Sequence, residues 1–343
     1  MTLKAIFYFQ EKGDAVNMNK IIIISSTKNA TGGTELLQQL CYKLRLFGQS
    51  AYMYYVGDFD KSPLKNKFSF YKNPAIETLE DEKDNIVVVP ETMTEYLKAI
   101  HNANGYLWWL SVDNYFGALR HNPDLLHKVF YKIKDLQNNF IFEKCVHLVQ
   151  SEYAKLYLEE RNITNVQYLS DYLNESYLQK ASENGCKERD NVILFNPKKG
   201  YEFTKKLIQE VPEYKWVALE NLSVNQMIDV MHSSKLYVDF GNHPGKDRIP
   251  REAAICGCCV ITGVRGAAAN NQDIMIDDEY KFEDSDSNIV KIHEKIANIM
   301  NDFDLHTRKF QSYRDRIKNE EKVFDSDVKK IFCSNENLRN EDE

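Results

Sequence analysis

The chain has 343 residues, enough for two domains with separate cores, and its 43% hydrophobic and 28% charged residues are typical of a folded globular protein. Its formal net charge of -7 argues against general nucleic-acid binding, because such binding needs a surplus of Lys and Arg that displaces counterions from phosphate. No apolar run approaches the roughly 20 residues that span a bilayer, and the first residues lack the long apolar centre of a signal peptide. We therefore expect a cytoplasmic protein without a transmembrane segment.

The first half of the chain alternates short apolar runs with helical patterns. Residues 21–24 are all isoleucine, which is typical of a strand buried on both faces, and a glycine-containing loop and a helical pattern follow. Further apolar runs occupy residues 51–57, 85–91, 105–111 and 145–151. This alternation predicts a parallel sheet with helices on its faces. We expect residues 1–17 to be an extension of little functional weight; alternatively, residues 7–10 could add an edge strand.

The second half repeats this pattern after a polar stretch near residues 178–190, which has the composition of a linker. Its strand candidates are residues 191–195, 215–219, 235–240 and 258–262, and its helices are expected to begin near Tyr201, Ser223 and Ile249. The predicted fold class is α/β, with two tandem Rossmann-like domains. The domains span residues 1–180 and 190–303, and residues 304–343 form C-terminal helices that pack on a domain face, followed by a frayed tail.

The cysteines predict neither disulfides nor a metal site. Cys256, Cys258 and Cys259 have C-x-C spacing without a second pair or a His partner, and they run into an apolar strand candidate. We expect them to be reduced residues of the core, where free Cys behaves as a small hydrophobic side chain.

The turn after the first strand carries the first candidate site residues, Gly32 and Gly33. Glycines let a ligand approach the backbone there, and the start of a helix offers unpaired N–H groups and a positive dipole end to an anion or a sugar hydroxyl. A tight turn also needs glycines for steric reasons alone, and the G-x-G-x-x-G pattern of a dinucleotide site is absent. Both interpretations stay open.

Lys198 and Lys199 lie in the turn after the first strand of the second half. Two cations and the dipole of the next helix would meet where the strands of an open sheet end, which is the usual ligand position in this architecture. Paired lysines are also common on solvated surfaces. The strand-to-helix position favours the binding of a diphosphate.

The densest group of polar residues lies in the segment 239–262. Its loop is expected to place four side chains at the carboxyl edge of the sheet: His243, Lys246, Asp247 and Arg248. Glu252, in the first turn of the helix that follows, can accept hydrogen bonds from a ribose or a sugar ring. The alternative is that Glu252 and its neighbour Arg251 are ordinary surface residues.

The glycine turn, the lysine turn and the segment 239–262, in their order along the chain, resemble the GT-B glycosyltransferases, most closely the large retaining family 4 group. The resemblance covers residues 18–300 and rests on the GG turn, the Lys-Gly turn and the segment PREA-x-x-x-G-C-x-V-I-T that begins at Pro250. It implies transfer of a hexose-type group from a nucleotide sugar to a glycan or lipid-linked acceptor, in the synthesis of a bacterial surface polysaccharide. It also implies that Gly33 faces the donor phosphates or the acceptor sugar, that Lys199 holds the donor diphosphate, and that Glu252 contacts the donor ribose.

The chain departs from the family pattern in two places. The first glutamate of the E-x7-E motif falls at Pro244, and the region of Asn196 replaces the arginine that usually precedes the lysine. Lys246 or Arg248 could supply the lost positive charge. No D-x-D motif follows an early strand, and the D-S-D sequence at 284–286 is expected to cap a helix, so we expect no divalent ion and no other cofactor.

Two carboxylates of the first domain are candidate catalytic residues. Asp113, after an apolar strand, would lie at the edge of the cleft and could orient the acceptor hydroxyl or accept its proton. Glu91 is a second candidate of the same kind, and either residue could simply begin a turn. Trp108 and Trp109 are expected to pack in the core, although one could stack on a sugar face.

Two other functions stay open. A nucleotide-sugar epimerase of the same architecture would need carboxylates on both sides of the sugar and no separate acceptor. A non-catalytic protein that binds a sugar nucleotide or a glycan would explain the missing motif glutamate. For the transferase, the expected partners are the donor and the acceptor, and a peripheral contact with a membrane also stays open.

Overall fold

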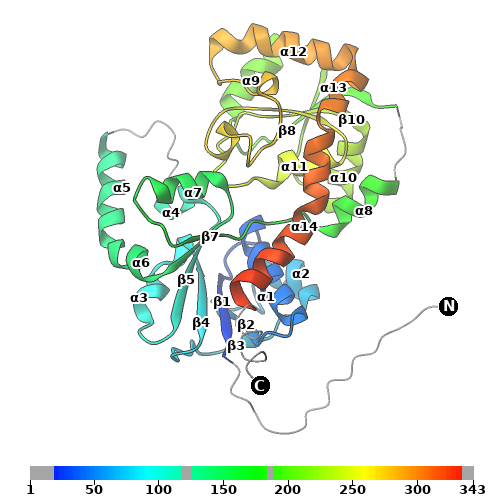
Figure 1. The fold of residues 1–343 in the computed structure, drawn as a ribbon. Helices are drawn as coiled ribbons and strands as arrows, with labels where there is room; N and C mark the ends of the chain where they lie inside the picture. The colour runs from blue at the N-terminus through cyan, green and yellow to red at the C-terminus, as the bar shows by residue number, and fades with distance from the viewer. Residues whose placement is uncertain (1–18, 118–124, 184–187, 334–343) are drawn as a thin grey trace, which may run out of the picture.

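The computed structural model describes residues 19–117, 125–183 and 188–333. Figure 1 shows two lobes, with strands β1 to β7 in the N-terminal domain and strands β8 to β11 in the C-terminal domain. The edge strand considered for residues 7–10 and the tail at residues 334–343 lie outside the described residues. Within those residues, no helix combines the length and the apolar character needed to cross a membrane.

The N-terminal domain is built on a seven-stranded parallel sheet in the order β3-β2-β1-β4-β5-β6-β7. Its strands are β1 (Ile21–Ser26), β2 (Ala51–Val56), β3 (Ala75–Ile76), β4 (Ile86–Pro90), β5 (Asn104–Trp109), β6 (Val146–Val149) and β7 (Val166–Tyr168). Its helices are α1 (Gly32–Leu46), α2 (Pro63–Phe68), α3 (Glu95–Ala99), α4 (Val112–Phe116), α5 (Leu125–Gln137), α6 (Asn139–Lys144) and α7 (Glu152–Glu159). The strand order reverses between β1 and β4, which is the switch point of this sheet.

The C-terminal domain contains a four-stranded parallel sheet in the order β11-β10-β8-β9. Its strands are β8 (Asp190–Phe195), β9 (Lys215–Ala218), β10 (Ser234–Asp239) and β11 (Cys259–Thr262). The helices that follow the first domain are α8 (Glu175–Glu183), α9 (Tyr201–Glu210), α10 (Val224–Ser233), α11 (Arg248–Ile255), α12 (Ile289–Asn301), α13 (Phe303–Lys309) and α14 (Gln311–Phe332). Here the order reverses between β8 and β10.

Both faces of the first sheet are buried, because alternate residues of each strand enter different cores. Ile22 and Ile24 pack in one hydrophobic cluster with helices α4, α6 and α7, whereas Ile21 and Ile23 pack in another with α1. The isoleucine run therefore behaves as predicted for a strand covered by helices on both sides. Trp108 and Trp109 are fully buried and lie on opposite faces of β5, so the prediction that they pack in the core is confirmed.

Helix α14 contacts both domains. Tyr313 and Ile317, near its start, belong to the core of the C-terminal domain, whereas Phe324, Val328 and Phe332 belong to the core of the N-terminal domain. Figure 1 shows this helix running from the upper lobe down along the lower one. Helix α14 thus covers part of one face of the N-terminal sheet, including β1.

The predicted α/β fold class is confirmed, and each strand candidate inside the described residues matches an observed strand to within two residues at either end. The two-residue strand β3 and the short helices α2 and α3 were not predicted, because too few residues are involved to show a periodic pattern. The three clustered cysteines are buried and free, as expected for core residues. The expected cap at 284–286 is wrong: Asp284 pairs with Arg265, and no side chain caps the short turn that begins at Asp286.

Candidate active site

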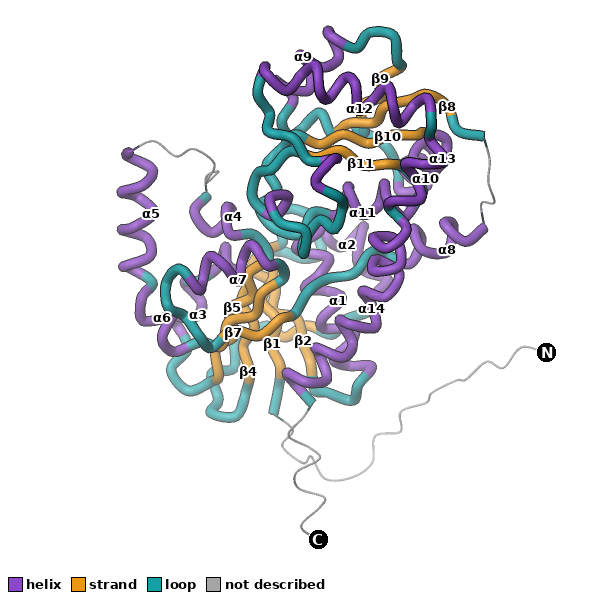
Figure 2. The backbone as a smooth tube through the Cα atoms, turned by 45° about the horizontal axis from the view of Figure 1, so that its top comes forward, coloured by secondary structure: helices purple, strands orange, loops and turns teal. Residues whose placement is uncertain are grey.

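The two sheets bring most of the candidate residues to their switch points. In the N-terminal domain, the turn before α1 follows β1, and Glu91 directly follows β4. In the C-terminal domain, Lys199 follows β8, and the loop that leads to α11 follows β10. Ligands of open α/β sheets bind outside the carboxyl ends of the strands at such points. Figure 2 shows the β10–α11 region of the upper sheet above the end of the lower one.

The start of α1 faces a cation from the other domain. Thr31 caps the helix, and its hydroxyl accepts a hydrogen bond from the Thr34 N–H in a capping box. A Cβ placed on Gly32 would lie 3.2 Å from Cδ and Nε of Arg248, so the absence of a side chain lets this arginine approach the helix. A Cβ placed on Gly33 would lie 3.6 Å from Cδ1 of Leu110.

Lys199 belongs to a chain of charges at the switch point of the second sheet. Its ammonium lies 2.7 Å from Oδ2 of Asp247, and Nδ1 of His243 lies 3.0 Å from the same oxygen. The other ring nitrogen of His243 is 3.8 Å from Asp239, whose second oxygen accepts a hydrogen bond from the Tyr237 hydroxyl. Lys198, by contrast, is exposed.

The charges of Asp247, His243 and Lys199 influence one another's protonation states. Burial opposes ionisation of Asp247, but Lys199 and His243 lower its pKa to about 2. Burial also disfavours the charged form of His243, yet Asp239 and Asp247 raise its pKa above the ordinary value. For Lys199, burial is outweighed by the carboxylates of Asp247, Asp239 and Asp113, so its pKa is raised as well. The switch point therefore keeps a protonated lysine in a partly open position.

Asp239, His243 and Asp247 could also offer one ligand atom each to a metal ion, since these atoms lie within 4.8 Å of one another. The Lys199 ammonium, 2.7 Å from Asp247, already supplies a positive charge at this place. Because a second cation beside it would be repelled, the group suits an internal ion network better than a metal centre.

A second network joins the two domains through Arg248. Its Nη1 lies 2.5 Å from Oε2 of Glu35 in the first turn of α1, and its Nη2 donates a hydrogen bond to Gln39 at 3.3 Å. Its Nε lies 3.6 Å from Asp171, which follows β7. Burial is outweighed by Glu35 and Asp171, so the pKa of Arg248 is raised.

Lys246 and Arg251 extend this network to α14. The Lys246 ammonium lies 2.7 Å from Oε1 of Glu320 and donates a hydrogen bond to the Ser170 hydroxyl at 3.1 Å. Arg251 is fully buried, and its two terminal nitrogens each lie 2.7 Å from a carboxylate, Asp171 and Glu320. The interpretation of Arg251 as a surface residue is therefore wrong.

Glu252 lies one turn inside α11 and not in its first turn, because the helix begins at Arg248. Burial raises its pKa to about 7, although Arg248, Arg251 and a hydrogen bond with Tyr177 act in the opposite direction. A carboxyl group with this pKa exchanges its proton near neutral pH and can both accept and donate hydrogen bonds to hydroxyls.

The two candidate catalytic carboxylates occupy different environments. Asp113, in α4, accepts a hydrogen bond from the Tyr153 hydroxyl at 3.1 Å and is close enough to Lys199 to raise the pKa of that lysine. Glu91 is buried in a short 3-10 turn, where its Oε2 accepts a hydrogen bond from the Leu110 N–H at 3.0 Å. Burial raises the pKa of Glu91 to about 7.

The two domains also contact each other directly near Asp113 and Glu91. The Val112 N–H, at the start of α4, donates a hydrogen bond to the Pro244 carbonyl at 3.0 Å. A Cβ on Gly245 would lie 2.3 Å from the Leu110 carbonyl oxygen, which no side chain could tolerate. Asp273 accepts hydrogen bonds from the N–H groups of Glu152 and Tyr153 at 2.7 and 2.9 Å. The structure is thus a closed form, in which the β10–α11 loop rests on the N-terminal domain.

Solved structures of similar architecture cover most of the chain. Sucrose-phosphate synthase from Thermosynechococcus elongatus has a TM-score of 0.62 at 12% identity, over 92% of this chain and 98% of its own. Anabaena HepE in complex with UDP has the same TM-score at 9% identity, over 92% of this chain and 100% of its own. The E. coli trehalose-6-phosphate structure bound with UDP-2-fluoro glucose has a TM-score of 0.53 at 10% identity, over 91% and 99%.

The chain has the GT-B fold. At these identities the likeness concerns the fold, and the closer resemblance to family 4 stays a prediction. No protein-family model matches the sequence, and no curated protein matches it. In this GT-B chain the candidate residues lie on both sides of the contact between the domains.

Several residues of the GT-B interface were not predicted. Asp171 and Glu320 follow no motif, and they come from the segment between β7 and α8 and from α14, far from Arg251 in the sequence. Gly245 carried a signal, since a glycine in a polar loop marks a close approach of backbone, but its partner Leu110 could not be inferred.

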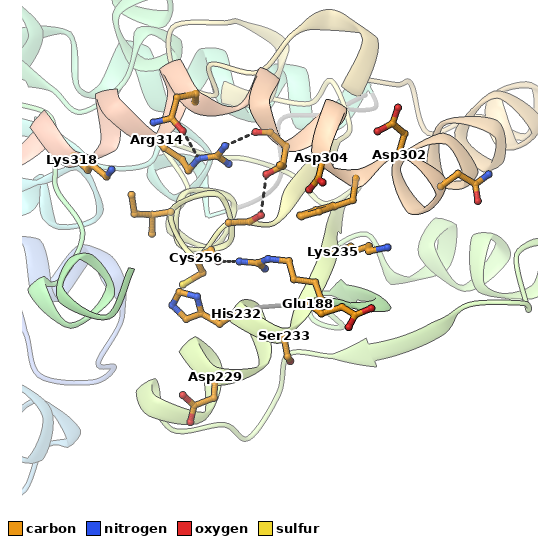
Figure 3. Close-up of a pocket in the computed structure, with 17 residues that line it drawn as sticks. Glu188, Asp229, His232, Ser233, Lys235, Cys256, Asp302, Asp304, Arg314 and Lys318 are labelled. Carbon is orange, nitrogen blue, oxygen red and sulfur yellow. Dashed lines mark hydrogen bonds between the residues drawn. The ribbon is translucent and has the colours of Figure 1, made fainter. Parts of the chain in front are cut away.

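A cavity of about 1090 Å³ lies away from the candidate site, at the amino-terminal ends of β8, β10 and β11 (Figure 3). Arg189 on its wall donates hydrogen bonds to the carbonyl oxygens of Met231, Ser234 and Cys256 at 2.9, 2.7 and 2.5 Å. This arginine therefore supplies hydrogen-bond donors to carbonyl groups at the carboxyl ends of helices α10 and α11. A smaller cavity of about 250 Å³ adjoins Asp171, Lys246 and Glu320 between the domains.

Proposed function

We propose that the protein is a glycosyltransferase that moves a sugar from a nucleotide-sugar donor to a glycan or lipid-linked acceptor. The observation that carries the proposal is the convergence of the α1 start, Lys199 and Arg248 at the facing switch points of a GT-B fold. Backbone N–H groups and cations at such a place suit a diphosphate. HepE and the E. coli structure of similar fold contain UDP and a UDP-sugar, so uridine nucleotides are the first donors to test.

In the proposed donor complex, Lys199 and Arg248 neutralise the diphosphate, and Gly32 and Gly33 let it approach the backbone at the start of α1. Glu252 contacts the ribose hydroxyls. Lys198, His243 and Lys246 also belong to the donor site, where their positive charges support binding of the diphosphate. Charge that develops on the leaving phosphate is stabilised by these fixed cations and dipoles, and we propose that no divalent ion is required.

The reaction breaks the bond between the anomeric carbon and the phosphate oxygen, and it forms a bond from that carbon to the acceptor oxygen. The electron pair of the broken bond stays on the nucleoside diphosphate, and the hydroxyl of the acceptor loses its proton. Asp113, near Lys199 and the domain contact, is the proposed group that orients this hydroxyl or takes its proton. Glu91 has a pKa near 7, which suits proton transfer, and its hydrogen bond to Leu110 also shapes the surface against which Gly245 packs.

The proposed catalytic cycle includes a separation of the domains. In the closed form Arg248 pairs with Glu35, and Lys199 pairs with Asp247. A donor diphosphate would compete for both cations, so its entry exchanges internal ion pairs for phosphate contacts. Closure after binding would exclude water from the reacting groups.

We further propose that transfer is retaining, that the sugar is a hexose and that the protein acts in the cytoplasm in the synthesis of a bacterial surface polysaccharide. These finer features are supported by the family 4 resemblance of the segment from Pro250 to Thr262. They can be tested separately, since product stereochemistry and sugar identity are measured on the isolated product.

The test combines binding and product analysis on the full chain. A thermal-shift screen with nucleoside diphosphates and nucleotide sugars should show a nucleotide that raises the melting temperature, because a ligand that binds only the folded state stabilises it. Incubation with that nucleotide sugar and acceptors should release the nucleoside diphosphate and form a glycoside. Conversion to an epimeric nucleotide sugar would establish the epimerase instead, and saturable binding without turnover over a broad acceptor panel would favour the non-catalytic protein.

A further inference from the structure

Helix α5 presents a stripe of large apolar side chains to solvent. Leu126, Val129, Phe130, Ile133 and Leu136 are 79%, 48%, 47%, 47% and 75% exposed. Their spacing of three and four residues places them on one face of the helix. Phe140, in the next helix, is also exposed, at 40%. A contiguous apolar surface of this kind marks a site of interaction.

The opposite face of α5 is anchored to the N-terminal domain. The ring of Tyr131 lies 4.4 Å from that of Phe116 in α4, centroid to centroid. Asp135 accepts hydrogen bonds from Arg161 at 2.7 and 2.9 Å and from the Tyr157 hydroxyl at 2.9 Å. In Figure 1 the helix stands at the outer edge of the lower lobe. The apolar stripe therefore points outward from a fixed helix.

Exposed lysines lie near this stripe: Lys132 borders it beside Leu136, and Lys128 lies one turn earlier, toward the anchored face. Lys128 and Lys132 are exposed on α5, and the ammonium of Lys98 lies 5.8 Å from the centre of the Phe140 ring. Of the acids on α5 and α6, Asp135 is bound to Arg161 and Glu143 accepts a hydrogen bond from Asn139 at 2.7 Å. The surface thus has a local surplus of positive charge in a chain whose formal net charge is -7.

An exposed apolar stripe with nearby lysines fits an anionic lipid surface better than a protein partner. A helix that lies in the headgroup region buries an apolar face while flanking lysines reach the lipid phosphates. The stripe is on the convex outer side of a helix and offers no groove to a second chain. Antiparallel pairing of two copies of α5 would bring the lysines of both copies to the same interface, where like charges repel.

We propose that α5 is an interfacial helix that holds the N-terminal domain on an anionic bilayer, with Leu126, Phe130 and Leu136 among the acyl chains. Helix α4, which carries Asp113, packs through Phe116 against the anchored face of α5, so α5 would lie between the bound membrane and the acceptor side of the proposed site. The use of this surface to collect a lipid-linked acceptor rests on the proposed function, whereas lipid binding itself does not.

Vesicle flotation of the full chain tests the proposal without any donor. Vesicles of equal parts phosphatidylcholine and phosphatidylglycerol should carry the protein, and vesicles of phosphatidylcholine alone should carry little. Added salt should weaken binding because it screens the lysines. Phe130→Ser with Leu136→Ser should lower the partition coefficient by about tenfold or more, as expected when buried apolar side chains are removed. Lys128→Glu with Lys132→Glu should abolish the preference for phosphatidylglycerol.

Matched control variants come from the C-terminal domain. Val290→Ser with Leu305→Ser replaces side chains that are 66% and 52% exposed, and Lys205→Glu with Lys291→Glu reverses two exposed lysines. Both controls should bind vesicles like the unmodified chain. Absence of flotation, or flotation that the α5 variants leave unchanged, would overturn the proposal. A dimer that dissociates in Phe130→Ser with Leu136→Ser, without vesicle binding, would make α5 a protein interface. Transfer to a soluble acceptor without vesicle binding would refute the membrane role alone.

Discussion

Nη1 of Arg248 and Oε2 of Glu35 lie 2.5 Å apart and connect the C-terminal domain to the first turn of α1. Their side chains are only 16% and 14% exposed, so water screens this ion pair less than a surface pair. The contact occupies the place where the proposed donor diphosphate would bind. Its strength therefore bears on both the stability of the closed form and the ease with which the domains separate.

A double-mutant cycle with Arg248→Ala and Glu35→Gln should give a coupling free energy of about 1–3 kcal/mol in urea unfolding, because the pair is largely buried. The control cycle is Lys206→Ala with Asp286→Asn, an exposed pair 2.6 Å apart, for which the coupling should be below about 1 kcal/mol. Equal coupling in the two cycles would mean that the interdomain pair does not stabilise the closed form.

Lys199→Ala should weaken binding of the stabilising nucleoside diphosphate by about 10- to 100-fold, because a charge-assisted hydrogen bond to phosphate is lost. The melting temperature without ligand should change little, since Asp247 keeps His243 as a partner. Calorimetric titration measures the affinity, and Lys205→Ala, an exposed lysine of the following helix α9, is the control. Affinity unchanged in Lys199→Ala would remove this lysine from the donor site.

Arg251→Leu should reduce the free energy of unfolding by about 3–5 kcal/mol, because Asp171 and Glu320 would lose a buried counter-charge. Arg316→Leu, an exposed arginine on α14, should change it by less than about 0.5 kcal/mol. Chemical denaturation of both variants checks the difference. Similar small losses would show that Lys246 alone compensates the two carboxylates.

Glu91→Gln should change the pH dependence of stability. The pKa of Glu91 is raised from 4.5 to about 7 in the folded protein, so the folded state holds this proton more tightly than the unfolded chain does. Its contribution to stability is therefore lost as pH rises from about 4.5 to about 7. The glutamine variant lacks this loss, so its stability relative to the unmodified chain should increase by up to about 3 kcal/mol between about pH 5 and about pH 8. A difference that does not vary with pH would contradict the raised pKa.

Asp113→Asn should lower turnover by about 100-fold or more while leaving donor affinity nearly unchanged, as expected for a group that acts on the acceptor hydroxyl. The amide can still accept the hydrogen bond from Tyr153, so the local structure should persist. Steady-state rates and donor titration separate the two effects. Unaltered turnover would exclude Asp113 from the mechanism.

Local patterns predicted the two sheets and the places where loops leave them. The isoleucine run, the GG turn and the Lys-Gly turn are each encoded by neighbouring residues, and topology then brings the strand ends together. The surroundings of Glu252 could not be predicted in the same way. Its near-neutral pKa depends on burial and on Arg248, Arg251 and Tyr177, and the orientation of these groups follows from packing between distant segments.

The buried partners of Arg251 could not be predicted from the sequence. Asp171 and Glu320 are 80 and 69 residues away from Arg251 along the chain, and neither lies in a recognisable pattern. Only the return of α14 to the N-terminal domain brings Glu320 next to Arg251. The side chain that looked like a surface arginine is thus a fully buried cation of the β10–α11 segment.

The path of α14 also bears on biosynthesis. Phe324, Val328 and Phe332 cover the face of the first sheet that carries Ile21 and Ile23, yet the ribosome adds them about 300 residues later. Domains usually fold as units while the chain emerges, with the N-terminal one first. Here α1 covers part of this face early, but the part that contacts α14 stays uncovered until residues 311–332 are released, so chaperone capture of nascent chains should persist until then.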